Sequence, residues 1–191
     1  MPHLMLKDLP RYECLLEAAR EFPDLDPSAA EAYLHLLRTA DEVFALSEAR
    51  LTAHGISQGR FGVLMLLWRC SAPRTCDVPI TRGECGPRTP AELAEAAGVT
   101  RATMTGLIDT LERDGFVVRE ADPSDRRMSL VNLTPKAEEF LRRYLPLHFR
   151  GAREVMGALD ESERKTLVQL LTKIQQCAAS VRVTPPTAPS A

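Results

Sequence analysis

Residues 98–115 read Gly-Val-Thr-Arg-Ala-Thr-Met-Thr-Gly-Leu-Ile-Asp-Thr-Leu-Glu-Arg-Asp-Gly, and this stretch decides the fold. Thr100 is a preferred helix N-cap. Apolar residues then recur at the spacing of one helical face, at Met104, Leu107, Ile108 and Leu111. The stretch therefore predicts a helix from Thr100 to about Arg113, with one face turned to a core and a polar edge turned away from it.

A shorter helix is predicted directly before this one. Residues 89–92 read Thr-Pro-Ala-Glu, which combines an N-cap, a proline at the first helical position and a glutamate at the third. Gly98 is expected to end this helix in the left-handed conformation, and Val99 to fill the turn from inside. The residues expected to face inward are Leu93, Ala94 and Ala97. Two helices joined by a tight, glycine-containing turn form a helix-turn-helix.

A β-hairpin is predicted after the second helix. Asp114 and Gly115 form a turn signal, residues 116–119 are strand-like, and residues 128–133 alternate with the period of a strand. The polar segment between them contains Arg126 and Arg127. A hairpin in this position is a wing, and its basic tip suits phosphates or the minor groove.

Further helices are predicted on both sides of this module. They are a short helix ended by Pro23, a second helix from about 26–28, a third over 57–69, a long helix from 134–135, and a last helix opened by Asp160 and Glu163. Ser28 and Glu31 have the spacing of a capping box. Pro146 is expected to kink or break the long helix.

The predicted fold is mainly α with a small β-hairpin wing, a winged helix-turn-helix joined to a helical dimerisation region. We expect N-terminal dimerisation helices over 1–56, the DNA-binding lobe over 57–133 with an insertion at 70–88, C-terminal dimerisation helices over 134–180, and a disordered tail over 181–191. Prolines and glycines mark the insertion, and prolines mark the tail.

Composition narrows the class of protein. The 191 residues are 45% apolar and 26% charged, as in a globular protein with a core. The sequence has no apolar run of about 18 residues and no export signal at its start, so we expect a cytoplasmic protein with no membrane partner. It has no GxSxG, HExxH or phosphate-binding glycine motif, so we expect neither an enzyme nor a cofactor.

The charge balance counts against nucleic acid as a partner. The formal net charge is −2, and between residues 88 and 127 six basic residues stand against eight acidic ones. If this module binds DNA, its arginines must be concentrated on the DNA-facing side, and two modules must act together.

Three of the five cysteines, Cys70, Cys76 and Cys85, fall in the insertion. They allow three interpretations: incidental loop cysteines, a redox sensor that forms a disulfide, or a soft-metal site completed from elsewhere. The sequence has no CxxC pair and the insertion has no histidine, which counts against a metal. Cys14 and Cys177 are interpreted as packing or incidental residues.

Three motifs in this order and spacing resemble the MarR family of bacterial regulators: residues 98–115 quoted above, Asp-Pro-Ser-Asp-Arg-Arg at 122–127, and Leu-Thr-Pro at 133–135. The resemblance covers roughly residues 30–178. The short helix before Pro23 further resembles the PecS/HucR branch, some members of which respond to urate. Ala18 stands where that branch usually carries a tryptophan.

The resemblance implies a repressor that binds a pseudo-palindromic operator in double-stranded DNA as a homodimer. The helix from Thr100 would lie in the major groove and the wing in the adjacent minor groove. The DNA-contacting residues so implied are Arg88, Thr89, Thr100, Arg101, Ala102, Thr103, Thr105, Gly106, Arg126 and Arg127. Arg101 suits a bidentate contact to guanine, and Asp125 is expected to hold the shape of the wing.

By the same resemblance, a small phenolic or aromatic effector binds between the dimerisation region and the DNA lobe and releases the operator. Candidate lining residues are His35, Phe44, Phe61 and Trp68, although each also suits a core position. Two alternatives stay open: a redox- or metal-responsive regulator that senses through the insertion cysteines, and a winged helix that serves protein–protein assembly.

Overall fold

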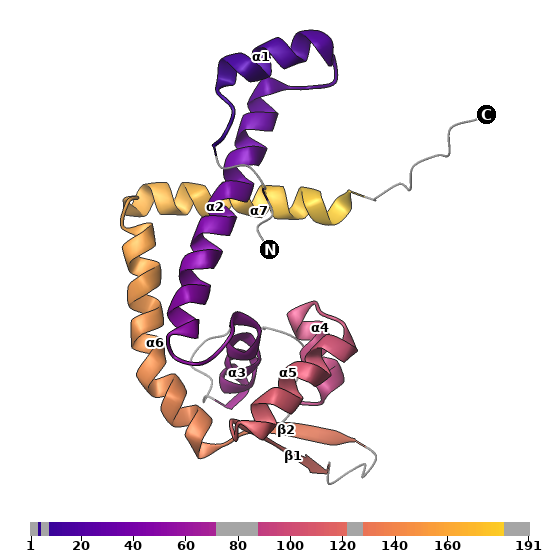
Figure 1. Cartoon of the computed structure of the whole chain (residues 1–191), viewed down its shortest axis with the longest axis vertical. Coiled ribbons are helices and arrows are strands. Elements are labelled where there is room, and N and C mark those ends of the chain that lie inside the picture. The colour runs from indigo at the N-terminus through magenta and orange to yellow at the C-terminus, as the bar shows by residue number, and fades with distance from the viewer. Residues whose placement is uncertain (1–3, 5–7, 72–87, 122–127, 182–191) are drawn as a thin grey trace, which may run out of the picture. The chain divides into compact units, whose positions relative to one another are not determined.

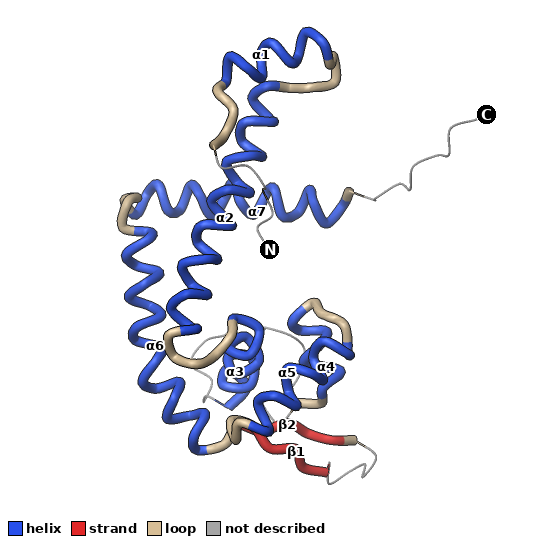
Figure 2. Tube along the Cα trace, viewed as in Figure 1, coloured by secondary structure: helices blue, strands red, loops and turns tan. Residues whose placement is uncertain are grey.

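The computed structural model describes Leu4 and residues 8–71, 88–121 and 128–181, without the side chains of 69–71. The elements are α1 (Tyr12–Glu21), α2 (Pro27–Thr52), α3 (Gln58–Ser71), α4 (Pro90–Ala97), α5 (Arg101–Arg113), β1 (Val117–Ala121), β2 (Ser129–Leu133), α6 (Pro135–Met156) and α7 (Glu161–Ser180). Helices dominate and one hairpin follows α5, as predicted (Figures 1 and 2). The chain divides into two compact units, residues 1–145 and 146–191. None of the described helices has the length and apolar character needed to cross a membrane.

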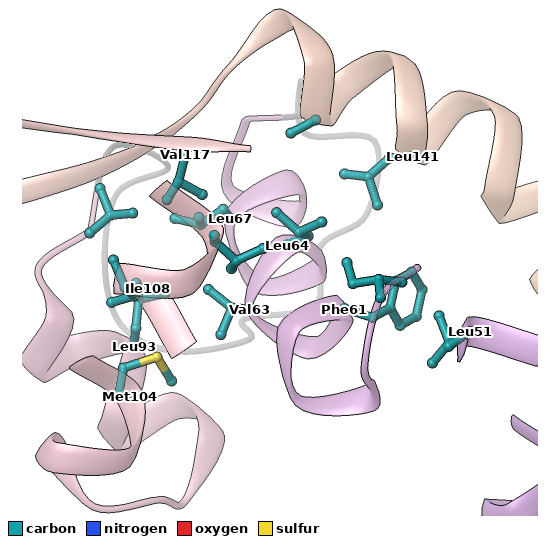
Figure 3. Close-up of a cluster of buried hydrophobic side chains, with 14 of the residues drawn as sticks. Leu51, Phe61, Val63, Leu64, Leu67, Leu93, Met104, Ile108, Val117 and Leu141 are labelled. Carbon is teal, nitrogen blue, oxygen red and sulfur yellow. The ribbon is translucent and has the colours of Figure 1, made fainter. Parts of the chain in front are cut away.

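One apolar core holds the first unit together (Figure 3). Its buried side chains come from the end of α2, from α3, α4 and α5, from both strands, and from the first half of α6; they include Leu51, Phe61, Val63, Leu64, Leu67, Leu93, Met104, Ile108, Leu111, Val117, Val131, Leu141 and Tyr144. Each fully buried large aliphatic side chain stabilises the fold by about 1.5–3 kcal/mol. The helix-turn-helix and the hairpin are therefore anchored by the same core.

In each of the two strands, every second residue faces this core. β1 and β2 pair antiparallel, with Val117 opposite Leu133 and Arg119 opposite Val131. Paired residues point to the same face of an antiparallel sheet, so Arg119 shares the inward face with the buried Val117 and Val131. Arg88 extends the sheet, because its carbonyl oxygen accepts the N–H of Val131 at 2.8 Å.

Helix starts follow the predicted caps with one exception. Thr89, Thr100 and Asp160 each accept a backbone N–H from the third residue after them. At the start of α2, however, the N-cap is Asp26 and not Ser28. Asp26 Oδ1 accepts the N–H of Ser28 at 2.9 Å and that of Ala29 at 3.1 Å. With proline at the first helical position, the aspartate directly before it occupies the N-cap position.

The turn of the helix-turn-helix is closed mainly by the backbone. Gly98 has φ +64°, the left-handed conformation predicted for it. The N–H of Val99 donates to the carbonyl of Ala94 at 3.0 Å. The predicted inward positions of Val99 and Ala97 are wrong: Val99 is 38% exposed and Ala97 is also exposed. Leu93 and Ala94 alone fill the contact with the core.

A break at Pro146 is not observed, because α6 continues through this residue to Met156. Proline removes one backbone hydrogen bond of a helix, and the helical turns on both sides persist here. The boundary between the two compact units nevertheless falls at Pro146.

Candidate nucleic-acid interface

The two sides of α5 differ sharply in exposure. Met104, Ile108 and Leu111 have no exposed surface. The residues of α5 and its N-cap that were predicted to contact DNA are all exposed, namely Thr100, Arg101, Ala102, Thr103, Thr105 and Gly106. The predicted polar edge therefore exists, and it is formed by small uncharged residues with one arginine near the start of the helix.

Helix capping engages several hydroxyls on this edge. Thr100 Oγ1 accepts the N–H of Thr103 at 3.1 Å, and the two hydroxyl oxygens lie 2.9 Å apart. Thr105 Oγ1 donates to the carbonyl of Arg101 at 2.9 Å. Within the described residues no ion pair involves the guanidinium of Arg101, and the residue is exposed.

The start of α4 is built differently. Thr89 is only 7% exposed, and its side chain forms a capping box with Glu92. Its Oγ1 accepts the N–H of Glu92 at 3.2 Å, while Glu92 Oε2 accepts the N–H of Thr89 at 2.8 Å. The geometry gives Thr89 a structural task, and beside it Arg88 joins the sheet through its backbone.

Arg119 connects the wing to α5. Its Nη2 lies 2.5 Å from Asp109 Oδ1 and its Nη1 lies 2.5 Å from Glu112 Oε2. Glu112 also accepts the backbone N–H of Arg119 at 3.2 Å. Burial lowers the pKa of Arg119, but the hydrogen bonds and charges of both carboxylates outweigh it and hold the pKa above its ordinary value.

The end of α5 is anchored by a second arginine. Arg60 of α3 forms an ion pair with Asp114, and Arg113 also approaches this carboxylate at 3.7 Å. Lys136 Nζ donates to the carbonyl of Asp114 at 2.6 Å and lies 4.9 Å above the ring of Phe116. The junction between α5, the wing and α6 is thereby fixed by charged groups.

These contacts hold several of the acidic side chains of the module within the protein. Glu92 is held in a cap, Asp109 and Glu112 by Arg119, and Asp114 by Arg60. Of the acidic residues counted between 88 and 127, Asp109, Glu112 and Asp114 thus form ion pairs, and Glu92 and Glu120 accept hydrogen bonds. Residues 98–108 contain no acidic side chain, so the acidic excess does not lie at the start of α5.

Several predicted site residues lie outside the described residues. They are Asp125, Arg126 and Arg127 of the wing and Cys76 and Cys85 of the insertion, together with the side chain of Cys70. Among the described residues no group of three or more His, Cys, Asp or Glu side chains is placed to hold a metal ion. Cys14 and Cys177 are exposed free thiols.

Comparison with known proteins identifies the module. The model of the MarR family matches residues 83–129. The HTH-type transcriptional repressor YetL of Bacillus subtilis is 32% identical over 166 residues, which cover 87% of this chain and 92% of YetL. The chain belongs to the MarR family. It is accordingly a DNA-binding transcriptional regulator with a winged helix, and not an enzyme.

Solved structures of similar fold include a DNA complex and a ligand-regulated protein. The transcriptional repressor CouR, bound to a 23-mer DNA duplex, is 26% identical with a TM-score of 0.61, over 74% of this chain and 90% of CouR. BpsR of Bordetella bronchiseptica, whose DNA binding is regulated by 6-hydroxynicotinic acid, is 26% identical with a TM-score of 0.59, over 74% of this chain and 91% of BpsR.

The four candidate effector residues of this MarR protein are not in equivalent settings. Phe61 is buried in the core, where its ring lies edge-on to Tyr144 with centroids 5.3 Å apart. Trp68 is half-buried against the same core. His35 and Phe44 are exposed on α2, and their positions, nine residues apart in the sequence, put them about 13 Å apart along the helix.

The ion-pair positions of Arg119 and Arg60 were not found from the sequence. Arg119 stands in a strand-like run with its partners on the preceding helix, and Arg60 and Asp114 are separated by 54 positions. Only the register of the hairpin places Arg119 on the inward face. The register depends on turn geometry and pairing, and periodicity alone does not supply it.

Proposed function

We propose that the chain is a homodimeric repressor that reads a pseudo-palindromic operator with α5 and releases it when a small aromatic or phenolic ligand binds. The main support for a DNA interface is the exposed edge of α5. Among the described residues Arg101 has no ion-pair partner there, and the neighbouring exposed side chains are small. YetL is named a transcriptional repressor, which supports repression rather than activation as the proposed effect on transcription.

Arg101 is proposed to read a base edge in the major groove. An arginine at the start of a recognition helix reaches guanine O6 and N7 with two hydrogen bonds. Arg126 and Arg127 at the tip of the wing, and Arg88 before α4, are proposed to contact the phosphate backbone or the minor groove. Thr89 and Thr100 mainly hold the two helix starts in place.

We propose that the helices on both sides of the DNA-binding lobe form the dimer interface. Large apolar side chains on them are exposed in the single chain, including Tyr12, Leu16, Phe22, Tyr33, Phe44, Leu147, Phe149, Val168, Leu170 and Ile174. Apolar surface on this scale is a feature of interaction surfaces. A two-fold dimer would place two copies of α5 about one turn of DNA apart.

The ligand is proposed to be a small aromatic acid or phenol. Regulation of BpsR by 6-hydroxynicotinic acid supports this class. We further propose that α1 places the chain near the PecS/HucR branch. The half-buried Ala18, where that branch carries a tryptophan, leads us to expect an effector other than urate. His35, Phe44, Phe61 and Trp68 remain the proposed lining.

A matched pair of substitutions on α5 tests the DNA interface. Arg101→Ala and Arg113→Ala each remove one positive charge, from opposite ends of the same helix. In gel-shift titrations on the DNA upstream of the chain's own gene, Arg101→Ala should weaken specific binding and relax one base preference. Arg113→Ala, whose side chain is 76% exposed, should bind as the wild type does. Equal behaviour of the two variants would contradict the assignment of the interface.

A further inference from the structure

Gly106 occupies the middle of α5, and nothing in the described chain accounts for a glycine there. Its backbone is helical and is not among the glycines with positive φ. A Cβ atom added to it would meet nothing within 4 Å outside the backbone of its own helix. Glycine destabilises a helix interior relative to alanine. The chain therefore bears a cost that neither its packing nor its backbone conformation requires.

Small, uncharged side chains one turn before and after Gly106 leave the helix backbone accessible. Ala102 lies one turn before it and Thr110 one turn after it. Thr110 Oγ1 donates to the carbonyl of Gly106 at 2.9 Å, and Thr105 Oγ1 donates to that of Arg101 at 2.9 Å. Both hydroxyl protons are used within the helix, so this part of the edge offers methyl groups and bare backbone to a partner.

The charge nearby favours a base over a phosphate at this point. Asp109 lies one turn beyond Gly106, and its side chain is 58% exposed even with Arg119 beside it. A phosphate at Gly106 would approach this carboxylate, whereas an uncharged base edge would not be repelled. The apolar group that the major groove displays is the C5-methyl of thymine.

We propose that Gly106 is a specificity-determining residue, whose missing side chain lets an operator thymine bring its methyl group against the backbone of α5. The proposal rests on the proposed role of α5 in the major groove. A Cβ at this position would hold the base away from the helix. Gly106 thus contributes to DNA reading through the space that it leaves.

The proposal predicts opposite effects on stability and on affinity. Gly106→Ala should raise Tm by roughly 2–4 °C, because alanine favours the helix and its Cβ has room. The same change should lower operator affinity about tenfold or more, the scale of one lost base contact. Gly62→Ala in α3 is the matched control, since Gly62 is also exposed and a Cβ there also meets nothing within 4 Å. It should raise Tm similarly and leave operator affinity unchanged.

Deoxyuridine scanning of the operator identifies the contact. Replacing a thymine by deoxyuridine removes only the methyl group. The wild type should lose affinity at one thymine in each half-site, and Gly106→Ala should no longer distinguish thymine from deoxyuridine there. Equal operator affinities of the wild type and Gly106→Ala would overturn the proposal, as would unchanged discrimination at every thymine. If the wild type does not bind specific DNA at all, the proposed function fails first, and this inference fails with it.

Discussion

Arg119 Nη2 lies 2.5 Å from Asp109 Oδ1, so the first strand of the wing is tied to the helix that carries the exposed edge. Glu112 completes the contact by accepting both a guanidinium N–H and the backbone N–H of Arg119. One arginine therefore has two consequences. It holds the wing against α5, and its one positive charge offsets part of the negative charge of two carboxylates on the helix that we propose to enter DNA.

Arg119→Ala should cost more free energy of DNA binding than free energy of unfolding. The ion pairs are partly exposed, with the Arg119 side chain at 26%, so we expect a stability loss of about 1 kcal/mol. Asp109 and Glu112 would lose the positive charge of Arg119, and the more negative α5 would oppose the approach of the DNA backbone over a distance of about one Debye length. Gel shifts over a range of salt concentrations should show the largest loss of affinity at low salt, where repulsion is least screened, and a shallower salt dependence than the wild type has.

Adding Asp109→Asn and Glu112→Gln to Arg119→Ala separates the two consequences. This triple variant removes the repulsion and leaves the wing untied. If the triple variant regains the salt dependence of the wild type but still binds more weakly, the remaining loss of affinity measures how much Arg119 contributes by positioning the wing. Full recovery to wild-type affinity would contradict a role of Arg119 in positioning the wing.

Thr89→Ala should destabilise the protein by about 1 kcal/mol, the usual cost of losing an N-cap. Thr89 is buried and its hydroxyl is held by Glu92, so the loss comes from the start of α4. Thr89→Ser keeps the acceptor oxygen and should retain most of the stability. Urea unfolding of the three proteins measures this. Equal midpoints for the serine and alanine variants would show that the hydroxyl does not matter.

The sequence predicted the helix-turn-helix well because local signals determine it. Thr89, Gly98 and Thr100 specify helix ends through their own side chains and backbone preferences. Met104, Ile108 and Leu111 define the buried face by spacing alone. The exposed edge of α5 follows from that face by elimination, so most of the helical part of the candidate site could be predicted without coordinates.

Features that depend on contacts between elements could not be predicted in this way. The partners of Arg119 follow from the hairpin register. Val99 is 38% exposed, although it directly follows a helix whose Leu93 and Ala94 are buried. In each case a local preference is modified by tertiary packing that spacing does not encode.

Acid should loosen the start of α7 through its cap. The N–H of Glu163 and the hydroxyl of Ser162 donate to Asp160 and hold its pKa below the ordinary value of 3.8. A lowered pKa means that the cap stabilises the helix above the unfolded pKa, and that this contribution is lost as the pH falls through the folded pKa. The protection of the Glu163 amide against exchange, relative to an unstructured chain at the same pH, should therefore fall below about pH 4. Asp160→Asn, whose acceptor oxygen does not titrate, should remove this acid dependence, and an unchanged profile would contradict the assignment.

Leu170→Glu should dissociate the proposed dimer. Leu170 is 52% exposed on α7, and no residue of that helix is buried within the single chain. A carboxylate placed inside an apolar interface is costly to desolvate and has no partner there. Light scattering should then give the mass of one chain, 21.2 kDa, and specific DNA binding should fall with the loss of the second half-site.

Gln169→Glu is the control, because it adds the same charge one residue away at another exposed position. It should leave the dimer intact if Leu170 lies at the centre of the interface. A dimer that persists in Leu170→Glu would remove α7 from the interface and leave the exposed apolar residues of α1, α2 and α6 as its proposed location.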